Sequence, residues 1–163
     1  GICNGFQALI KLGLVPYGRI MDTDESFPTL TYNVIGRHQS KLVRTRVCST
    51  RSPWLAGTEV GDIYTVPISH GEGRFLASQE LIEQLAANRQ IATQYAGLDG
   101  YATMDIAFNP NGPVCAIEGI TPPDGRVFGK MGHSERIGPA LYRNVPGTYD
   151  MHLFASAVRY FKK

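Results

Sequence analysis

Apolar and polar residues repeat with two different periods along the chain, and this predicts both helices and strands. Helical spacing of apolar residues over Phe6–Leu12 ends at Gly13 and Pro16, which both stop helices. Ser78 is placed to cap a second helix, whose apolar face lies within Leu81–Ala86. The chain therefore contains at least two amphipathic helices of ordinary length.

Runs rich in β-branched residues between the helices predict strands, and a third helix is expected from near Thr148, with Asp150 in its first turn. The turn chemistry of Thr121–Gly125 predicts a hairpin between the last two strands. The predicted strands cover residues 29–34, 41–48, 62–68, 90–95, 114–120 and 126–131. Mixed helices and strands with no repeat or linker predict one α/β domain over residues 1–163, with a mixed sheet and flanking helices.

Composition limits the function classes. The 163 residues carry a net charge of only +2, which gives no electrostatic argument for nucleic acid, and no apolar run is long enough for a membrane helix. The three cysteines (Cys3, Cys48 and Cys115) form neither a disulfide framework nor a Cys-x-x-Cys metal motif, so we expect a cytoplasmic protein. Cys48 and Cys115 lie in apolar strand contexts and are expected to be buried.

Cys3 lies between two glycines, in Gly1-Ile2-Cys3-Asn4-Gly5, immediately before the first helix. This pattern predicts a sharp strand-to-helix turn that exposes a nucleophile, with the helix N-terminus favouring the thiolate. Such a turn needs a strand before it, yet only two residues precede Cys3 and the chain has no initiator methionine. We therefore expect these residues to be the C-terminal part of a longer polypeptide, so that the domain described by this sequence lacks its N-terminal part.

A cysteine nucleophile needs a base and a group that orients the base, and His133 with Glu135 fits both roles. They directly follow a predicted strand, and their i, i+2 spacing can place both side chains on one side. A surface turn is the alternative explanation of this spacing. A zinc deaminase would also need Pro-Cys-x-x-Cys, which is absent, so no metal site is predicted.

The Gly1–Gln7 motif followed by the late His133 and Glu135 resembles the class I, triad-type glutamine amidotransferases, which have a flavodoxin-like α/β fold. Further stretches, in the same order along the chain, resemble the phosphoribosylformylglycinamidine synthase family of de novo purine biosynthesis. These stretches are Ser69–Phe75, Asn109–Gly112, Ala116–Ile120 and Asp124–His133.

The resemblance implies that Cys3 attacks glutamine, with His133 as acid and base, Glu135 orienting it, and the backbone N–H of Asn4 binding the oxyanion. A second oxyanion donor would come from an upstream glycine-rich segment that these residues lack, so we expect the fragment alone to be inactive. The ammonia would pass to a synthetase, fused or separate, that uses ATP and magnesium to make formylglycinamidine ribonucleotide. No cofactor is expected in the glutaminase domain itself.

Gln7 lies one helical turn past Cys3, so it is placed either to reach the substrate or to cap the helix. The resemblance implies that Asn33 and Arg37 lie near the glutamine site and that His70 lies in or next to the substrate pocket. The alternative for His70 and Glu72 is that they simply form a turn.

The chain also departs from the family pattern. Gly132 and Ser134 flank His133 where the family usually has prolines, and His38 stands where phenylalanine is usual. The turn that carries the base is therefore expected to be less rigid.

Two other function classes stay open at this point. A cysteine hydrolase such as a peptidase would share the nucleophile turn and the histidine, and a noncatalytic docking module would keep the domain for assembly only. An unpaired edge of the truncated sheet would also favour self-association.

Overall fold

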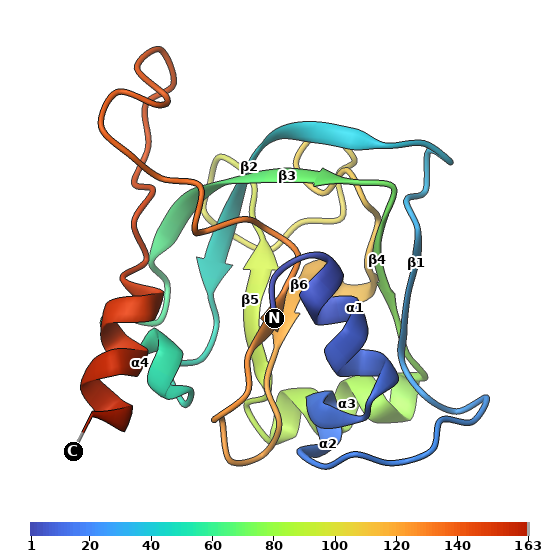
Figure 1. Cartoon of the computed structure of the whole chain (residues 1–163). Helices are drawn as coiled ribbons and strands as arrows, with labels where there is room; N and C mark the ends of the chain where they lie inside the picture. The colour runs from blue at the N-terminus through green and yellow to red at the C-terminus, as the bar shows by residue number, and fades with distance from the viewer. Residues whose placement is uncertain (163) are drawn as a thin grey trace.

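The structure, a computed structural model, describes residues 1–162 and has a mixed α/β fold (Figure 1). Short 3-10 turns occupy Pro53–Leu55 and Val114–Ala116. The helices are α1 (Asn4–Lys11), α2 (Leu14–Tyr17), α3 (Gln79–Ala87) and α4 (Leu153–Phe161). The strands are β1 (Thr29–Tyr32), β2 (Gln39–Val47), β3 (Ile63–His70), β4 (Glu72–Leu76), β5 (Ile91–Tyr95), β6 (Ile117–Ile120) and β7 (Gly129–Lys130).

The main sheet has the strand order β3-β2-β5-β6-β7, and each of these neighbouring pairs is antiparallel. Ile2 adds a parallel bridge to Lys130 of β7, which makes the sheet mixed at that edge. β1 and β4 form a separate antiparallel pair beside α1 (Figure 1). The predicted α/β class with a mixed sheet is confirmed.

The core that supports the N-terminal segment lies between α1, α3 and the sheet. Phe6 and Ile10 of α1 are buried there against Phe75, Ile117 and Met131. A second apolar cluster, which includes Leu55, Phe128 and Leu153, lies beneath α4. Because Phe6 is fully buried, α1 cannot rotate without exposing it, and this fixes the direction in which residue 3 leaves the sheet.

Most helix ends follow the local signals in the sequence. Gly13 adopts a left-handed conformation (φ 76°) directly after α1, and the Ser78 hydroxyl accepts a hydrogen bond from the Leu81 N–H at 3.2 Å before α3. No helix within residues 1–162 is both long and apolar enough to cross a membrane.

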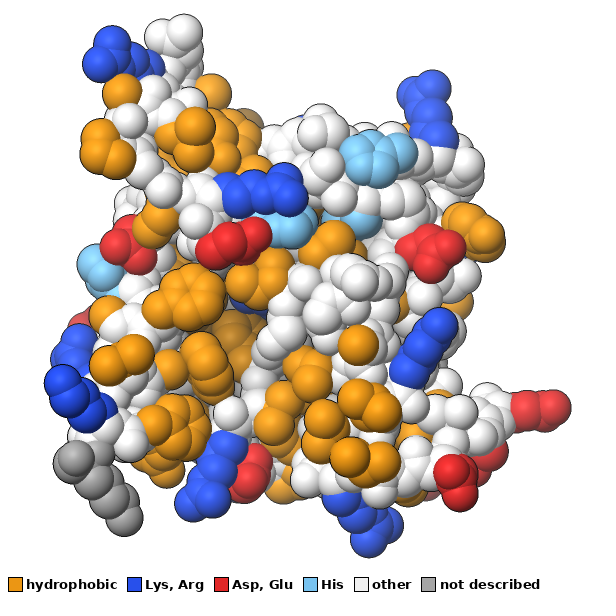
Figure 2. Space-filling model, viewed as in Figure 1, with side chains coloured by type: hydrophobic (Ala, Val, Ile, Leu, Met, Phe, Trp, Pro, Cys, Tyr) orange, Lys and Arg blue, Asp and Glu red, His pale blue; other side chains and the backbone are white. Residues whose placement is uncertain are grey.

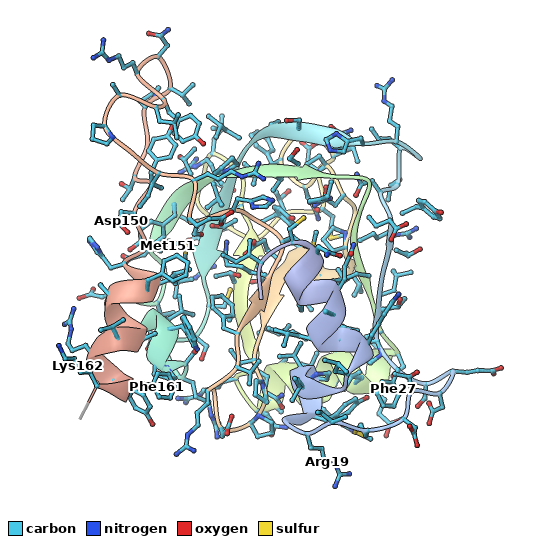
Figure 3. The ribbon with its side chains drawn as sticks, viewed as in Figure 1. Arg19, Phe27, Asp150, Met151, Phe161 and Lys162 are labelled. Carbon is cyan, nitrogen blue, oxygen red and sulfur yellow. The ribbon has the colours of Figure 1, made fainter. Side chains whose placement is uncertain are left out.

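The predicted start of the last helix is wrong. α4 begins at Leu153, because Met151 is buried in the second cluster and His152 takes a left-handed conformation (φ 52°). The Asp150 carboxylate accepts the His152 N–H at 2.7 Å just before the helix, and Figure 3 places Asp150 and Met151 there, with Phe161 and Lys162 at the other end. The burial of Met151 thus outweighs the local signal for a helix that starts near Thr148.

Two further features differ from what the sequence indicates. Glu72 lies in a strand, β4, which pairs with β1 and which the periodicity of the sequence does not indicate. Cys115 is exposed in the turn at Val114–Ala116, since β6 begins only at Ile117, and Cys48 is only partly buried.

Candidate active site

Cys3 forms the predicted sharp turn between a strand-like segment and α1. Its N–H donates to the Lys130 carbonyl at 2.8 Å, and the Lys130 N–H donates to the Gly1 carbonyl at 3.0 Å. Cys3 itself has φ 52° and ψ −109°, a sparsely populated conformation for a residue with a side chain. A Cβ on Gly1 would lie 2.6 Å from the Gly5 carbonyl oxygen, so the tight turn requires glycine there.

The thiol of Cys3 is half-buried, and its Sγ lies 4.0 Å from the Ser69 carbonyl oxygen. Burial raises the pKa of Cys3, although a hydrogen bond from the Asn4 N–H and the charge of Arg136 lower it and Glu135 raises it again. The Asn4 N–H at the helix start favours the thiolate, as expected, but burial outweighs this effect and the net pKa of the Cys3 thiol is raised. A nearby base is needed to take the proton when the sulfur attacks.

His133 lies just beyond β7, in a turn held against the main sheet. Its backbone N–H donates to the Pro67 carbonyl at 2.8 Å, and its Nδ1 lies 2.6 Å from Glu135 Oε1. The Nδ1–H therefore donates to the carboxylate, which leaves Nε2 as the basic nitrogen. Nε2 is buried and has no hydrogen-bond partner among the described residues. A lone pair in this state is available to accept a proton.

Cys3 and His133 both lie against the end of β3. Cys3 approaches Ser69, while His133 is bonded to Pro67 of the same strand. The charges of Glu135 and Arg136 both act on the Cys3 thiol, and these two side chains lie 3.7 Å apart. The predicted candidate triad residues, distant in sequence, thus gather at one place.

Asn33 is placed as a structural tie. It is 2 % exposed, and its Nδ2 donates to the carbonyls of His70 at 2.8 Å and Arg37 at 3.0 Å. Its Oδ1 accepts from the Gly73 N–H at 3.1 Å. The Asn33 amide is thus bonded within the fold, and the expected substrate contact by Asn33 stays a prediction. Arg37 is exposed in the loop that Asn33 closes.

Gln7 is half-buried one helical turn after the nucleophile. Its Nε2 donates to the Glu72 carbonyl at 2.8 Å, which ties α1 to β4. Gln7 and Glu72 also line a cavity of about 330 Å³ beside β1. The side-chain oxygen of Gln7 is the part of this amide that remains for a ligand.

His70 lies in a buried polar network behind the site. Its Nε2 is 3.3 Å from Asn111 Nδ2, which also donates to the Tyr95 hydroxyl at 2.6 Å. Gly73 packs directly against the ring. Burial, then repulsion from His133 and His38, lowers the pKa of His70 to about 4. His70 is therefore neutral at pH 7 and holds the interior together.

This buried histidine predicts a loss of stability in acid. Between a pKa of 6.5 in the unfolded chain and about 4 in the folded chain, the unfolded state binds more protons, so the free energy of unfolding falls as pH drops through this range. The His70 contribution is about 3 kcal/mol at most. Urea denaturation at pH 7.5 and 4.5 measures it. The free energy of unfolding should fall less between pH 7.5 and 4.5 in H70Q than in the parent. In H152Q, a change at an exposed position, it should fall as much as in the parent. An equal fall in H70Q and the parent would contradict the prediction.

Sequence reasoning about catalysis missed a buried ion pair beneath the His133 turn. Glu118 and Lys130 lie 3.1 Å apart, with side chains 0 % and 1 % exposed. A charged residue within each of two apolar strand segments, Ala116–Ile120 and Phe128–Met131, was the available signal. No three His, Cys, Asp or Glu side chains within residues 1–162 are grouped as metal ligands.

A cysteine in a sharp turn and a His-Glu pair on an α/β sheet are typical of enzymes that cleave amides through a thioester. The chain belongs to the family described as CobB/CobQ-like glutamine amidotransferase domain, whose model matches residues 1–161.

Within this family, the chain is similar to proteins that carry one particular name. The chain is 37 % identical over 147 residues to "Phosphoribosylformylglycinamidine synthase subunit PurQ" of Synechocystis sp., covering 90 % of this chain and 60 % of that protein. The protein of the same name from Moorella thermoacetica is 34 % identical over the whole chain and 62 % of its own length. The solved structure of PurLQS from Thermotoga maritima matches with a TM-score of 0.70 and 27 % identity, over 98 % of this chain and 60 % of that one. The chain thus spans about 60 % of the length of these relatives.

Proposed function

We propose that residues 1–163 belong to the glutamine-hydrolysing domain of a phosphoribosylformylglycinamidine synthase, with Cys3, His133 and Glu135 as its catalytic triad. The observation that carries this proposal is the buried, unpartnered Nε2 of His133, oriented by Glu135 and held over the strand that Cys3 approaches. Family membership and the similarity to PurQ proteins support glutamine as the substrate.

In the proposed mechanism, His133 Nε2 takes the proton of the Cys3 thiol as Sγ attacks the side-chain amide carbon of glutamine. The backbone N–H of Asn4 stabilises the oxyanion, in keeping with its hydrogen bond to the Cys3 sulfur. His133 then protonates the leaving nitrogen, and ammonia departs as the γ-glutamyl thioester forms. Water, deprotonated by His133, hydrolyses the thioester to glutamate, and the proton returns to Cys3.

The proposed partner is a synthetase that receives the ammonia and uses ATP and magnesium to convert formylglycinamide ribonucleotide to the amidine in the cytoplasm. The glutaminase domain itself needs no cofactor for the steps above. The relative of known structure carries the name PurLQS, which is consistent with a glutaminase that works within a complex. Self-association through the sheet edge beside Gly1–Cys3 is a second proposed contact, and size-exclusion chromatography would detect it.

A covalent-labelling experiment tests the glutaminase proposal. An electrophilic glutamine analogue should label Cys3 stoichiometrically in the natural polypeptide that carries these residues, and free glutamine should protect it. Cys48 is the internal control, because burial raises its pKa to about 11 and its thiol bonds Gln94 Oε1 at 3.0 Å. Peptide mass spectrometry locates the label.

The outcomes separate the function classes. Labelling of Cys3 that glutamine does not prevent would favour a hydrolase with another substrate, such as a peptidase, and no labelling of Cys3 would favour a docking module. A polypeptide limited to residues 1–163 should release little ammonia, because among its proposed site residues only Asn4 supplies an oxyanion donor. Appreciable glutamine hydrolysis by that piece would contradict this last expectation.

A further inference from the structure

The buried Glu118–Lys130 pair binds both backbone groups of Gly132, the residue that precedes His133. Glu118 Oε1 accepts the Gly132 N–H at 2.6 Å, and Lys130 Nζ donates to the Gly132 carbonyl at 3.0 Å. Lys130 Nζ also donates to the Ser134 hydroxyl at 3.0 Å. The two residues on either side of His133 are therefore both held by Lys130.

The same pair is anchored in the sheet, away from solvent. The second carboxylate oxygen of Glu118 accepts from the Thr93 hydroxyl of β5 at 2.5 Å. The three N–H groups of the Lys130 ammonium are matched by three acceptors: Glu118, Gly132 and Ser134. A buried pair with all its hydrogen bonds made has a fixed geometry, unlike an exposed pair.

This arrangement accounts for the two departures from the family pattern around the histidine. A proline at position 132 has no N–H to donate to Glu118. A Cβ at that position would also lie 2.6 Å from Val66 Cγ1 and 3.0 Å from Glu118 Oε1. A proline at position 134 would remove the hydroxyl that Lys130 binds. Hydrogen bonds from the ion pair thus hold a turn that prolines would otherwise stiffen.

Lys130 also connects the two halves of the site through its backbone. Its carbonyl accepts the Cys3 N–H at 2.8 Å and its N–H donates to the Gly1 carbonyl, so the nucleophile turn is bonded to the residue whose side chain holds the His133 turn. A displacement of Lys130 changes the position of Cys3 relative to His133. The ion pair is well placed to set that distance.

We infer that Glu118 and Lys130 are positioning residues for the Cys3–His133 pair, which they align through Gly132 and Ser134 without touching the substrate. This inference rests on the proposed function for its kinetic consequence. The alternative is that the Glu118–Lys130 pair stabilises the sheet and has no effect on the position of Cys3 or His133. The two explanations differ in what happens when both charges are removed together.

The variants K130M, E118Q and K130M/E118Q test the inference in the natural polypeptide that carries these residues. Each single variant is expected to lower the melting temperature, because it leaves one charged or polar partner buried without its match. The double variant should regain much of that loss, but kcat for glutamine hydrolysis should stay reduced about 10- to 100-fold with KM little changed, since the base is misplaced. Recovery of both the melting temperature and kcat in the double variant would overturn the inference.

S134A is a milder variant that keeps the test decisive if the ion-pair variants fail to fold. It removes one hydrogen bond from Lys130 and should lower kcat several-fold, at roughly the cost of one hydrogen bond, without a matching change in KM. The matched control is Q90M. Gln90 is also buried and donates to the carbonyls of Pro16 and Thr121, at 2.9 Å and 2.8 Å, so its loss should lower the melting temperature but leave kcat unchanged. An unchanged kcat in S134A would count against the inference.

The rate at which iodoacetamide alkylates Cys3 at pH 7 separates this inference from the proposed function. Alkylation needs the base but not glutamine, so K130M/E118Q should react as slowly as H133A. If the parent does not hydrolyse glutamine, the proposed function fails and alkylation alone decides the inference. Alkylation of the double variant at the parental rate would overturn it in either case.

Discussion

Replacing Cys3 by alanine is expected to abolish glutamine-dependent synthesis of the amidine, by at least about 10³-fold, and to leave the reaction driven by free ammonia unchanged. The physical reason is that no thioester can form without Sγ, whereas the synthetase active site does not need the glutaminase once ammonia is supplied. Steady-state assays with glutamine and with an ammonium salt measure the two rates on the same protein.

Cys48 provides the matched control for this substitution. Its thiol is partly buried, like that of Cys3, but burial raises its pKa to about 11, and it bonds Gln94 within the sheet and lies outside the candidate triad. C48A should therefore retain glutamine-dependent activity. Equal losses of the glutamine-dependent and ammonia-dependent reactions in C3A would instead indicate a role in assembly, and the glutaminase proposal would be withdrawn.

Replacing His133 by alanine is expected to lower kcat for glutamine hydrolysis by about 10²- to 10⁴-fold. Burial raises the pKa of the Cys3 thiol, and in the proposed mechanism Nε2 of His133 accepts its proton. Glu135 is about 39 % exposed and acts through the imidazole, so E135Q should cost less than H133A. Stopped assays of glutamate and ammonia release measure both variants.

His152 is the control for H133A, because it lies at the surface before α4 and pairs with Asp150 at 3.0 Å. H152Q should keep the parental kcat. If H133A retained the parental rate, the base would have to be another group, and the proposed triad would be wrong.

Apolar side chains gather on the face of the molecule shown in Figure 2. A cavity beside Gly1 and Glu135 is lined by Trp54, Phe128 and Phe154.

Local signals predicted the parts of the site whose geometry is decided within a few residues. The glycine at position 1 is required because its backbone nearly touches Gly5, and the turn at Cys3 follows from that contact. Ser78 caps α3 through its own hydroxyl in the same local way. His133 and Glu135 are two residues apart, so their hydrogen bond also needs little beyond the turn itself.

Positions whose role depends on distant partners were not predictable in this way. The Asn33 amide bonds His70 and Gly73, which follow it by about forty residues, and the sequence around Asn33 does not indicate these contacts. α4 begins three residues after Asp150, because Met151 is buried in an apolar cluster that includes residues of other elements. Nothing near these residues in sequence encodes those contacts.

Local features of the chain were enough to predict the α/β class, the turn at Cys3 and the candidate base at His133, because short-range sterics, capping and periodicity act within one or two turns of chain. That Cys3 and His133 both lie against β3 follows only from the folded structure. Gly1 and Cys3 bond there to Lys130, which follows them by more than 120 positions, and Lys130 in turn pairs with Glu118. Pairing between distant strands, and the burial of charge that it permits, are properties of the whole fold, and this is why the ion pair beneath the histidine became visible only there.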